Sequence, residues 1–325
     1  WPPLPRPRPT HFERTGVTDA EPIGGESDQE DHRRGLWYGV AAYLVWGLSP
    51  LFWNLTDDAE AVDLLLHRTL WALPILAIAL SLRHKWPEVR EAYRSGRSRL
   101  ITVVAAGLRA TNWGVFLWAV TNDQVVEASL GYFINPLVSV ALGVVVLREH
   151  LRRLQWVAVG IAAAGVAVMT IRVGTLPWVA IVLALSFGLY GLLKKNPATP
   201  SPLVSLFGEV SVLALPALVV LTLFRDSQTG GFGSSIGMSV FLVGTGLITV
   251  IPLLLFGAAA KRIKLSTIGL LQYIAPTLQF LLGVTVFDEH LSTDALIGFV
   301  CVWVALAVYT WDNLRATTRS GSLVV

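Results

Sequence analysis

Charged residues and cysteines are both scarce in this chain. Charged residues make up 14% of its 325 residues, whereas a soluble domain carries about 25%. Too few charges are therefore present to cover a surface that faces water. The single cysteine, Cys301, lies within an apolar run. A disulfide framework within the chain is thus excluded, and we expect Cys301 to be a small packing residue.

Sequence motifs for ATP hydrolysis and for catalysis are missing as well. The chain has no phosphate-binding GxxxxGK[ST] loop, so hydrolysis of ATP is not expected. It has no HExxH motif and no pair of aspartates within one apolar run, so an enzyme is not expected. Asp63 and His67, four residues apart, form the nearest cluster of metal-binding side chains and lack further ligands. We therefore expect neither a metal nor another cofactor.

Long apolar runs are what the chain does contain. Most have the length of about 17–25 residues that an α-helix needs to cross roughly 30 Å of hydrocarbon. Helices are expected throughout, because an open sheet would leave backbone groups unpaired in lipid. The fold class is therefore an all-α polytopic membrane protein with ten transmembrane helices. The ten predicted spans are 36–54, 61–82, 100–121, 125–147, 153–171, 176–193, 203–224, 239–260, 266–287 and 294–312.

The second five runs resemble a copy of the first five. Tyr132–Leu151 reads YFINPLVSVALGVVVLREHL, and Gln272–Leu291, 140 residues later, reads QYIAPTLQFLLGVTVFDEHL. An odd number of spans per copy inverts the second copy in the bilayer, an arrangement typical of secondary transporters. We expect a disordered cytoplasmic tail at 1–34, a first five-helix repeat at 35–172, a second, inverted repeat at 173–313 and a cytoplasmic tail at 314–325.

The distribution of Lys and Arg predicts the orientation. With the N-terminus in the cytoplasm, the loop 83–99 places six basic residues inside, whereas the outer loops hold only Arg172 and Arg225. Because cytoplasmic loops are enriched in Lys and Arg, both termini are expected to be cytoplasmic. The net charge of +3 thus reflects Lys and Arg residues that set the orientation of the chain in the membrane. The lipid bilayer is the expected surrounding, and nucleic acid is not an expected partner.

Charged side chains also occur inside the predicted spans. A charge at the centre of a membrane helix costs about 2.5–3.5 kcal/mol unless it faces a polar cavity and pairs. Arg109 and Glu209 lie at similar depths, so we expect them to pair across the bundle. Glu209 is the main candidate for proton coupling and His67 a second one. The alternatives are a structural ion pair for Arg68, Arg109 and Glu209, and a packing role for His67.

Polar side chains gather beside two prolines in equivalent places of the two copies, Pro136 and Pro276. Each proline removes a backbone hydrogen bond and permits a kink, so we interpret the two as paired hinges, with simple packing as the alternative. Polar groups next to them would face the interface between the copies or bond neighbouring helices. The predicted substrate cavity consists of Asn112, Trp113, Tyr132, Asn135, Gln272 and Tyr273.

Several of these segments resemble one known family. EASLGYFINPLVSVALGVVVLREHLRRLQW (Glu127–Trp156), HRTLW (His67–Trp71) and NWGVFLWAV (Asn112–Val120) are similar to the RarD permeases, a branch of the EamA family in the drug/metabolite transporter superfamily. The resemblance spans roughly Arg34 to Asp312. It implies ten helices in two inverted repeats, the plasma membrane and movement of small molecules. The family's usual label, chloramphenicol-sensitive protein, implies export of a drug or metabolite.

The sequence therefore predicts a secondary active transporter that moves a small metabolite or drug-like molecule by alternating access. The alternative is a non-transporting membrane sensor or scaffold, which would usually carry a soluble output domain. The expected partners are the small-molecule substrate, the bilayer and protons as a candidate coupling ion. A monomer and a homodimer both remain open.

Overall fold

The structure is a computed structural model that describes residues 23–55, 60–173, 177–224, 232–288 and 293–321. All regular secondary structure in these residues is helical. The helices are α1 (Ile23–Trp53), α2 (Ala61–Leu82), α3 (Trp86–Ala92), α4 (Gly96–Thr121), α5 (Val125–Val145), α6 (Arg153–Val173), α7 (Trp178–Lys194), α8 (Pro202–Phe224), α9 (Ile236–Ala260), α10 (Leu265–Leu271), α11 (Ile274–Thr285) and α12 (Thr293–Gly321).

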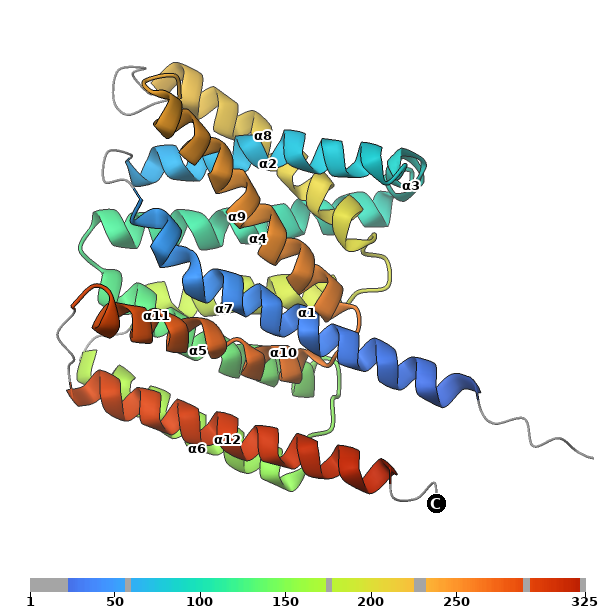
Figure 1. The fold of residues 1–325 in the computed structure, drawn as a ribbon, viewed down its shortest axis with the longest axis vertical. Helices are drawn as coiled ribbons and strands as arrows, with labels where there is room; N and C mark the ends of the chain where they lie inside the picture. The colour runs from blue at the N-terminus through green and yellow to red at the C-terminus, as the bar shows by residue number, and fades with distance from the viewer. Residues whose placement is uncertain (1–22, 56–59, 174–176, 225–231, 289–292, 322–325) are drawn as a thin grey trace, which may run out of the picture.

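The long helices lie side by side, and the chain reverses direction between them (Figure 1). The start of α1 and the end of α12 lie on the same side of the bundle, which we call the termini side. The ends of α2, α5, α7 and α9 also lie there, whereas α1, α4, α6, α8 and α11 end on the opposite side (Figure 1).

Seven of the predicted spans correspond to helices long and apolar enough to cross a membrane. One of them, Leu265–Thr285, consists of α10 and α11 together. Three shorter apolar helices, Arg153–Val168, Trp178–Lys194 and Leu296–Asp312, complete the bundle. Many large apolar side chains point outward, such as Leu215 at 68% exposure. The chain is therefore a helical membrane protein whose outer surface suits lipid.

The first helix begins earlier than the sequence indicated. Residues 23–34, assigned by composition to a disordered tail, form the start of α1, and residues 1–22 lie outside the described residues. The extension is held by an ion pair one turn apart, Arg34 to Glu30 at 2.6 Å. A second ion pair joins Asp31 to Arg262, beside the end of α9, at 2.9 Å. At the other terminus, α12 continues to Gly321 through most of the expected tail at 314–325.

The basic loop 83–99 contains a short helix, α3, that packs on α8. The ring of Trp86 meets that of Phe207 edge-on, with ring centroids 5.4 Å apart. The hydroxyl of Tyr93, just after α3, donates to the carbonyl of Val204 at 3.1 Å. These contacts give the loop a defined structure, whereas its basic residues had predicted only the orientation of the chain in the membrane.

Most helix contacts join the first half of the chain (α1–α6) to the second half (α7–α12). Helix α1 packs on α9 and α11, α2 packs on α8 and α9, and α6 packs on α12. Helix α7 packs on α4 and α5, and α5 also packs on α10. The two halves are thus interleaved rather than separate domains.

Helices α5 and α10 run antiparallel in close contact. Gly269 of α10 lies against the carbonyl of Pro136, where a side-chain β carbon would come within 2.7 Å of that oxygen. Beyond the end of α5, the carboxylate of Glu149 accepts the backbone N–H groups of Leu265 at 2.7 Å and Ser266 at 2.9 Å. Glu149 therefore caps the first turn of α10 from another part of the chain.

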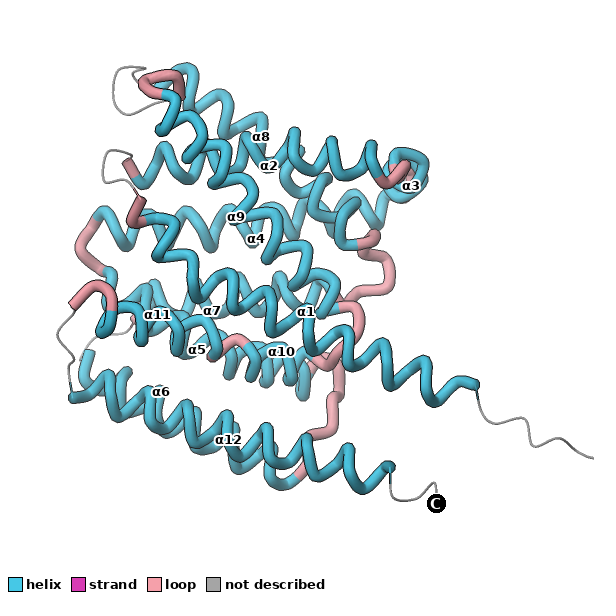
Figure 2. The backbone as a smooth tube through the Cα atoms, viewed as in Figure 1, coloured by secondary structure: helices cyan, strands magenta, loops and turns pink. Residues whose placement is uncertain are grey.

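A short break separates α10 from α11, visible as a turn in Figure 2. Pro276 has no N–H to give to the carbonyl of Gln272 four residues earlier. That carbonyl instead accepts the N–H of Ala275 at 3.2 Å, which tightens the turn. Pro136, at the equivalent place, lies inside a continuous α5. The paired hinges expected from the sequence thus have different local structures.

Candidate functional site

A cavity of about 1180 Å³ lies between the two halves of the chain. Trp53 at the end of α1, Ala61 at the start of α2 and Val125 at the start of α5 are among its lining residues. These helix ends lie on the side opposite the termini (Figure 1). The cavity therefore reaches that side of the bundle.

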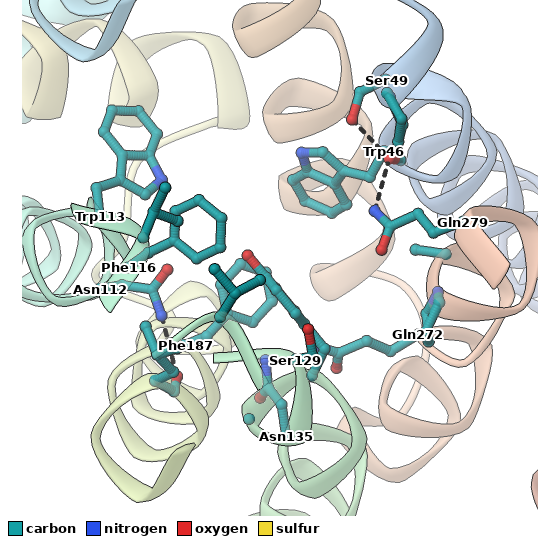
Figure 3. A pocket seen from close by; sticks show the side chains of 18 of the residues that line it. Trp46, Ser49, Asn112, Trp113, Phe116, Ser129, Asn135, Phe187, Gln272 and Gln279 are labelled. Carbon is teal, nitrogen blue, oxygen red and sulfur yellow. Dashed lines mark hydrogen bonds between the residues drawn. The ribbon is translucent and has the colours of Figure 1, made fainter. Parts of the chain in front are cut away.

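Aromatic side chains supply much of the cavity wall. Trp113 and Phe116 of α4 face Trp46 of α1 across the space, with Phe187 of α7 near the floor (Figure 3). Trp46 and Phe187 meet edge-on, with ring centroids 5.9 Å apart. Such a wall suits the apolar body of an organic molecule.

Polar side chains interrupt this wall at a few places. The amide nitrogen of Asn112 donates to the carbonyl of Leu183 and to the hydroxyl of Ser186, both at 3.0 Å. Asn135 and Gln272 are buried, and their side-chain oxygens have no hydrogen-bond partner among the described residues. Both amides line the cavity (Figure 3). They are acceptors that a bound molecule can satisfy.

Two arginines lie at the ring of Trp113. The guanidinium carbon of Arg68 is 4.1 Å from the ring centroid, and that of Arg109 is 5.1 Å from it. Arg68 also donates its Nε to the hydroxyl of Thr249 at 3.0 Å. Cations over an indole face are attracted by the ring quadrupole. Trp113 therefore holds two positive charges at one part of the cavity wall.

Behind this wall lies a buried charged cluster centred on Glu209, which is fully buried. Arg109 approaches Glu209 at 3.4 Å, as expected from the sequence, and Lys194 forms a second ion pair with it. Tyr190 donates to the same carboxylate at 3.1 Å and Ser205 at 2.8 Å. Two cations thus share one carboxylate, which ties α4, α7 and α8 together.

The remaining predicted site residues divide into two groups. Tyr132 and Pro276 line the cavity together with Asn112, Trp113, Asn135, Gln272, Arg68 and Arg109. Tyr273, Glu209, His67 and Pro136 are not among its lining residues. Tyr273 is buried, and its hydroxyl donates to the carbonyl of Phe133 at 3.2 Å. His67 is buried, with its ring 6.4 Å from that of Phe232.

Several members of the site were not predicted from the sequence. Lys194 directly follows the predicted span 176–193, yet it is buried in the cluster. Ser205 stands one helical turn before Glu209, a spacing that could have identified it as a partner. Trp46, Phe187 and Gln279 carried no signal in the sequence beyond their residue type.

Two lysines on the termini side, Lys195 and Lys261, join neighbouring loops, and we call them the lysine latch. Lys195 donates to the carbonyls of Ile263 at 2.5 Å and Ala260 at 3.1 Å. Lys261 donates in return to the carbonyl of Thr199 at 2.8 Å. The loop between α7 and α8 is thereby tied to the loop between α9 and α10. Neither loop contributes to the cavity lining in the described part of the chain.

One segment has the spacing of a hydrolase nucleophile motif. Gly233–Gly237 reads GSSIG and fits GxSxG, which requires a serine exposed between a strand and a helix. Here the hydroxyl of Ser235 accepts the N–H of Met238 at 3.0 Å and caps α9. The structure gives this serine a helix-capping role.

Comparison with known proteins identifies the family. Residues 33–171 match the EamA-like transporter family. The chain is 48% identical over 293 residues to a protein named RarD of Streptomyces exfoliatus, covering 90% of this chain and 93% of that relative. It is 37% identical over 294 residues to protein RarD of Escherichia coli, covering 90% and 99%. It is 42% identical to an uncharacterized transporter of Pseudomonas aeruginosa, covering 88% and 96%.

A solved crystal structure shares the fold, with a TM-score of 0.67 at 20% identity, covering 87% of this chain and 98% of the other. This likeness agrees with the helical bundle described above. The family match and the extent of the RarD relatives together settle the classification: the chain belongs to the EamA-like transporter family.

Proposed function

We propose that this protein is a secondary active transporter that moves a small metabolite or drug-like molecule across the plasma membrane by alternating access. The observation that carries the proposal is the cavity between the halves, whose lining reaches the side opposite the termini, whereas the loops joined by the lysine latch contribute no lining residue. A large pocket with an aromatic wall and few polar groups suits a small organic molecule. A path open to one side at a time is what alternating access requires.

The pattern of helix contacts supports two inverted five-helix repeats. An offset of 140 residues relates α1 to α7, α2 to α8, α4 to α9, α5 to α10 with α11, and α6 to α12. The packing of α1 on α9 and α11 then corresponds to the packing of α7 on α4 and α5. The pairs α2 with α8, α5 with α10, and α6 with α12 each join equivalent helices. Contacts related in this way are expected of a pseudo-two-fold axis in the membrane plane.

Orientation and direction complete the proposal. The basic loop 83–99 lies on the termini side (Figure 1), so we assign that side to the cytoplasm. The cavity would then face outward, and family resemblance favours export. Proton coupling would act through the cluster of Arg109, Lys194 and Glu209, with Arg68 and His67 as neighbouring groups. In such a cycle Glu209 would exchange cation partners between the two states.

The test compares metabolites inside and outside cells that contain the wild-type chain, no copy, or a cavity variant, Asn135→Leu. Trp311→Leu is the matched control, because Trp311 is 56% exposed on the outer surface. A small-molecule class should accumulate inside cells without the chain or with Asn135→Leu, and return to normal with wild type or the control. Identical profiles, with equal amounts of each protein in the membrane, would contradict transport. A sensor or scaffold would tolerate Asn135→Leu.

A further inference from the structure

The charges around the cavity are unbalanced. Arg68 and Arg109 line it, and no Asp or Glu lies among its described lining residues. Glu209 lies behind the wall and already bonds Lys194, Tyr190 and Ser205 in addition to Arg109. The cavity surface is therefore positive.

The donors of Arg109 point to a missing partner. The side chain is 4% exposed, and none of its three side-chain nitrogens makes a hydrogen bond within the described residues, although Nη1 lies 3.4 Å from a Glu209 oxygen. Arg68 has one hydrogen bond, to the neutral hydroxyl of Thr249, and no ion pair in the part of the chain that the structure describes. Guanidinium groups recognise carboxylates with several donors at once.

We propose that the cavity takes organic anions: molecules with one carboxylate on an apolar, preferably aromatic, body. Arg68 and Arg109 would hold the acid group beside Trp113, whose ring both guanidinium groups approach. The body would lie along the aromatic wall formed by Trp46, Phe116 and Phe187 (Figure 3). The amide oxygens of Asn135 and Gln272 would accept neutral hydroxyl or N–H groups of that body.

This inference names the substrate class of the proposed transporter and so depends on the proposed function. It can be tested separately, because equilibrium binding to the purified protein does not require transport. A compound that binds as proposed but is never moved in vesicles would refute transport alone. A transported compound whose binding shows no preference for an acid group would refute the anion site alone.

The experiment uses three series of probes, each with a single body and three end groups. The first series is phenylpropionate, phenylpropionamide and phenylpropylamine, and the others carry an indole or an unbranched alkyl body. Binding to the full chain in lipid nanodiscs is measured by titration calorimetry near neutral pH and at low salt. A hydrogen bond to a charged group is stronger than one to a neutral group, so the carboxylate should bind about tenfold more tightly than its amide.

The variant arm isolates Arg68. Arg68→Gln should weaken carboxylate binding by about tenfold and leave amide binding nearly unchanged, while Arg68→Lys should restore much of the loss. Arg153→Gln, at an exposed position at the start of α6, is the control. The proposal fails if the ammonium probe binds best, if no series prefers its carboxylate (absence of binding included), or if folded Arg68→Gln binds the carboxylate like wild type. If Arg68→Gln does not fold, the relative affinities of the carboxylate, amide and ammonium probes for the wild-type chain still test the proposal.

Discussion

The hydroxyl of Tyr273 donates to the backbone carbonyl of Phe133 at 3.2 Å, and the two residues are separated by 140 positions, the offset between the similar halves of the chain. Both side chains are buried. The bond therefore joins positions that correspond in the two copies. It lies where α5 meets the turn between α10 and α11, in the interior of the bundle.

Removing this hydrogen bond should lower stability without changing the cavity wall. Tyr273→Phe deletes one buried hydroxyl and its hydrogen bond to the carbonyl of Phe133, so we expect a loss of about 1 kcal/mol in the free energy of unfolding. The measurement is an unfolding titration with denaturing detergent in mixed micelles. Tyr132→Phe, whose hydroxyl belongs to a partly exposed residue of the cavity wall, should unfold like wild type. Equal stability of Tyr273→Phe and wild type would contradict a structural role for the bond.

The cluster around Glu209 makes a stronger prediction. Glu209→Gln leaves Arg109 and Lys194 buried without a counter-charge, which should cost about 3 kcal/mol of stability and abolish transport. Ser211→Ala, at an exposed position on the same helix, serves as the control.

Transport by Glu209→Gln would also test whether Glu209 couples transport to protons. Initial rates are compared in proteoliposomes with and without a pH gradient. If Glu209→Gln transports with full proton dependence, Glu209 is not the coupling group, and its role is to lock α4, α7 and α8.

The lysine latch predicts a shift in accessibility. The double variant Lys195→Ala with Lys261→Ala removes hydrogen bonds made by two charged donors, each worth about 1.5–3 kcal/mol. The fraction of molecules that are open on the termini side should therefore rise at least about tenfold. The reporter is Ser186→Cys in the cavity wall, in a Cys301→Ala background, labelled with an impermeant thiol reagent in oriented vesicles. Lys264→Ala is the control, because the ammonium group of Lys264 makes only a long hydrogen bond among the described residues, to the carbonyl of His150 at 3.4 Å. Unchanged labelling from the termini side in the double variant would show that the latch does not hold this side closed.

The proposed inversion of the two repeats predicts opposite locations for two loops. Arg153 begins α6 and Asp288 follows α11, and both are exposed. Arg153→Cys and Asp288→Cys, each in a Cys301→Ala background, should react with an impermeant reagent from opposite faces of the membrane. Reaction of both from the same face would rule out the opposite crossing of α5 and α10 with α11.

Much of the helix layout could be predicted from the sequence because hydropathy records contact with lipid directly. The predicted span 100–121 lies within α4, 125–147 begins with α5, and 203–224 matches α8 to within one residue. The pairing of Arg109 with Glu209 was also predictable, since charges at similar depth in lipid must neutralise one another.

Other features depend on tertiary contacts that leave no periodic trace. Lys194 lies at the end of an apolar run, a place typical of interfacial lysines, and only the fold turns it toward Glu209. Tyr273 and Gln272 are neighbours in a polar pair, yet the turn directs Gln272 to the cavity and Tyr273 to the carbonyl of Phe133. The direction of each side chain depends on the turn between α10 and α11. Hydropathy predicted one continuous span at 266–287 and so could not show this turn.

The break between α10 and α11 has a mechanical consequence. Its antiparallel neighbour α5 is unbroken although it carries a proline at the corresponding place. A continuous helix, α5, therefore lies beside an interrupted one, and we expect bending to concentrate at the interruption, Gln272 and Tyr273. Two segments of similar sequence would then differ in stiffness, with α5 as the rigid helix and α10 with α11 as the flexible pair.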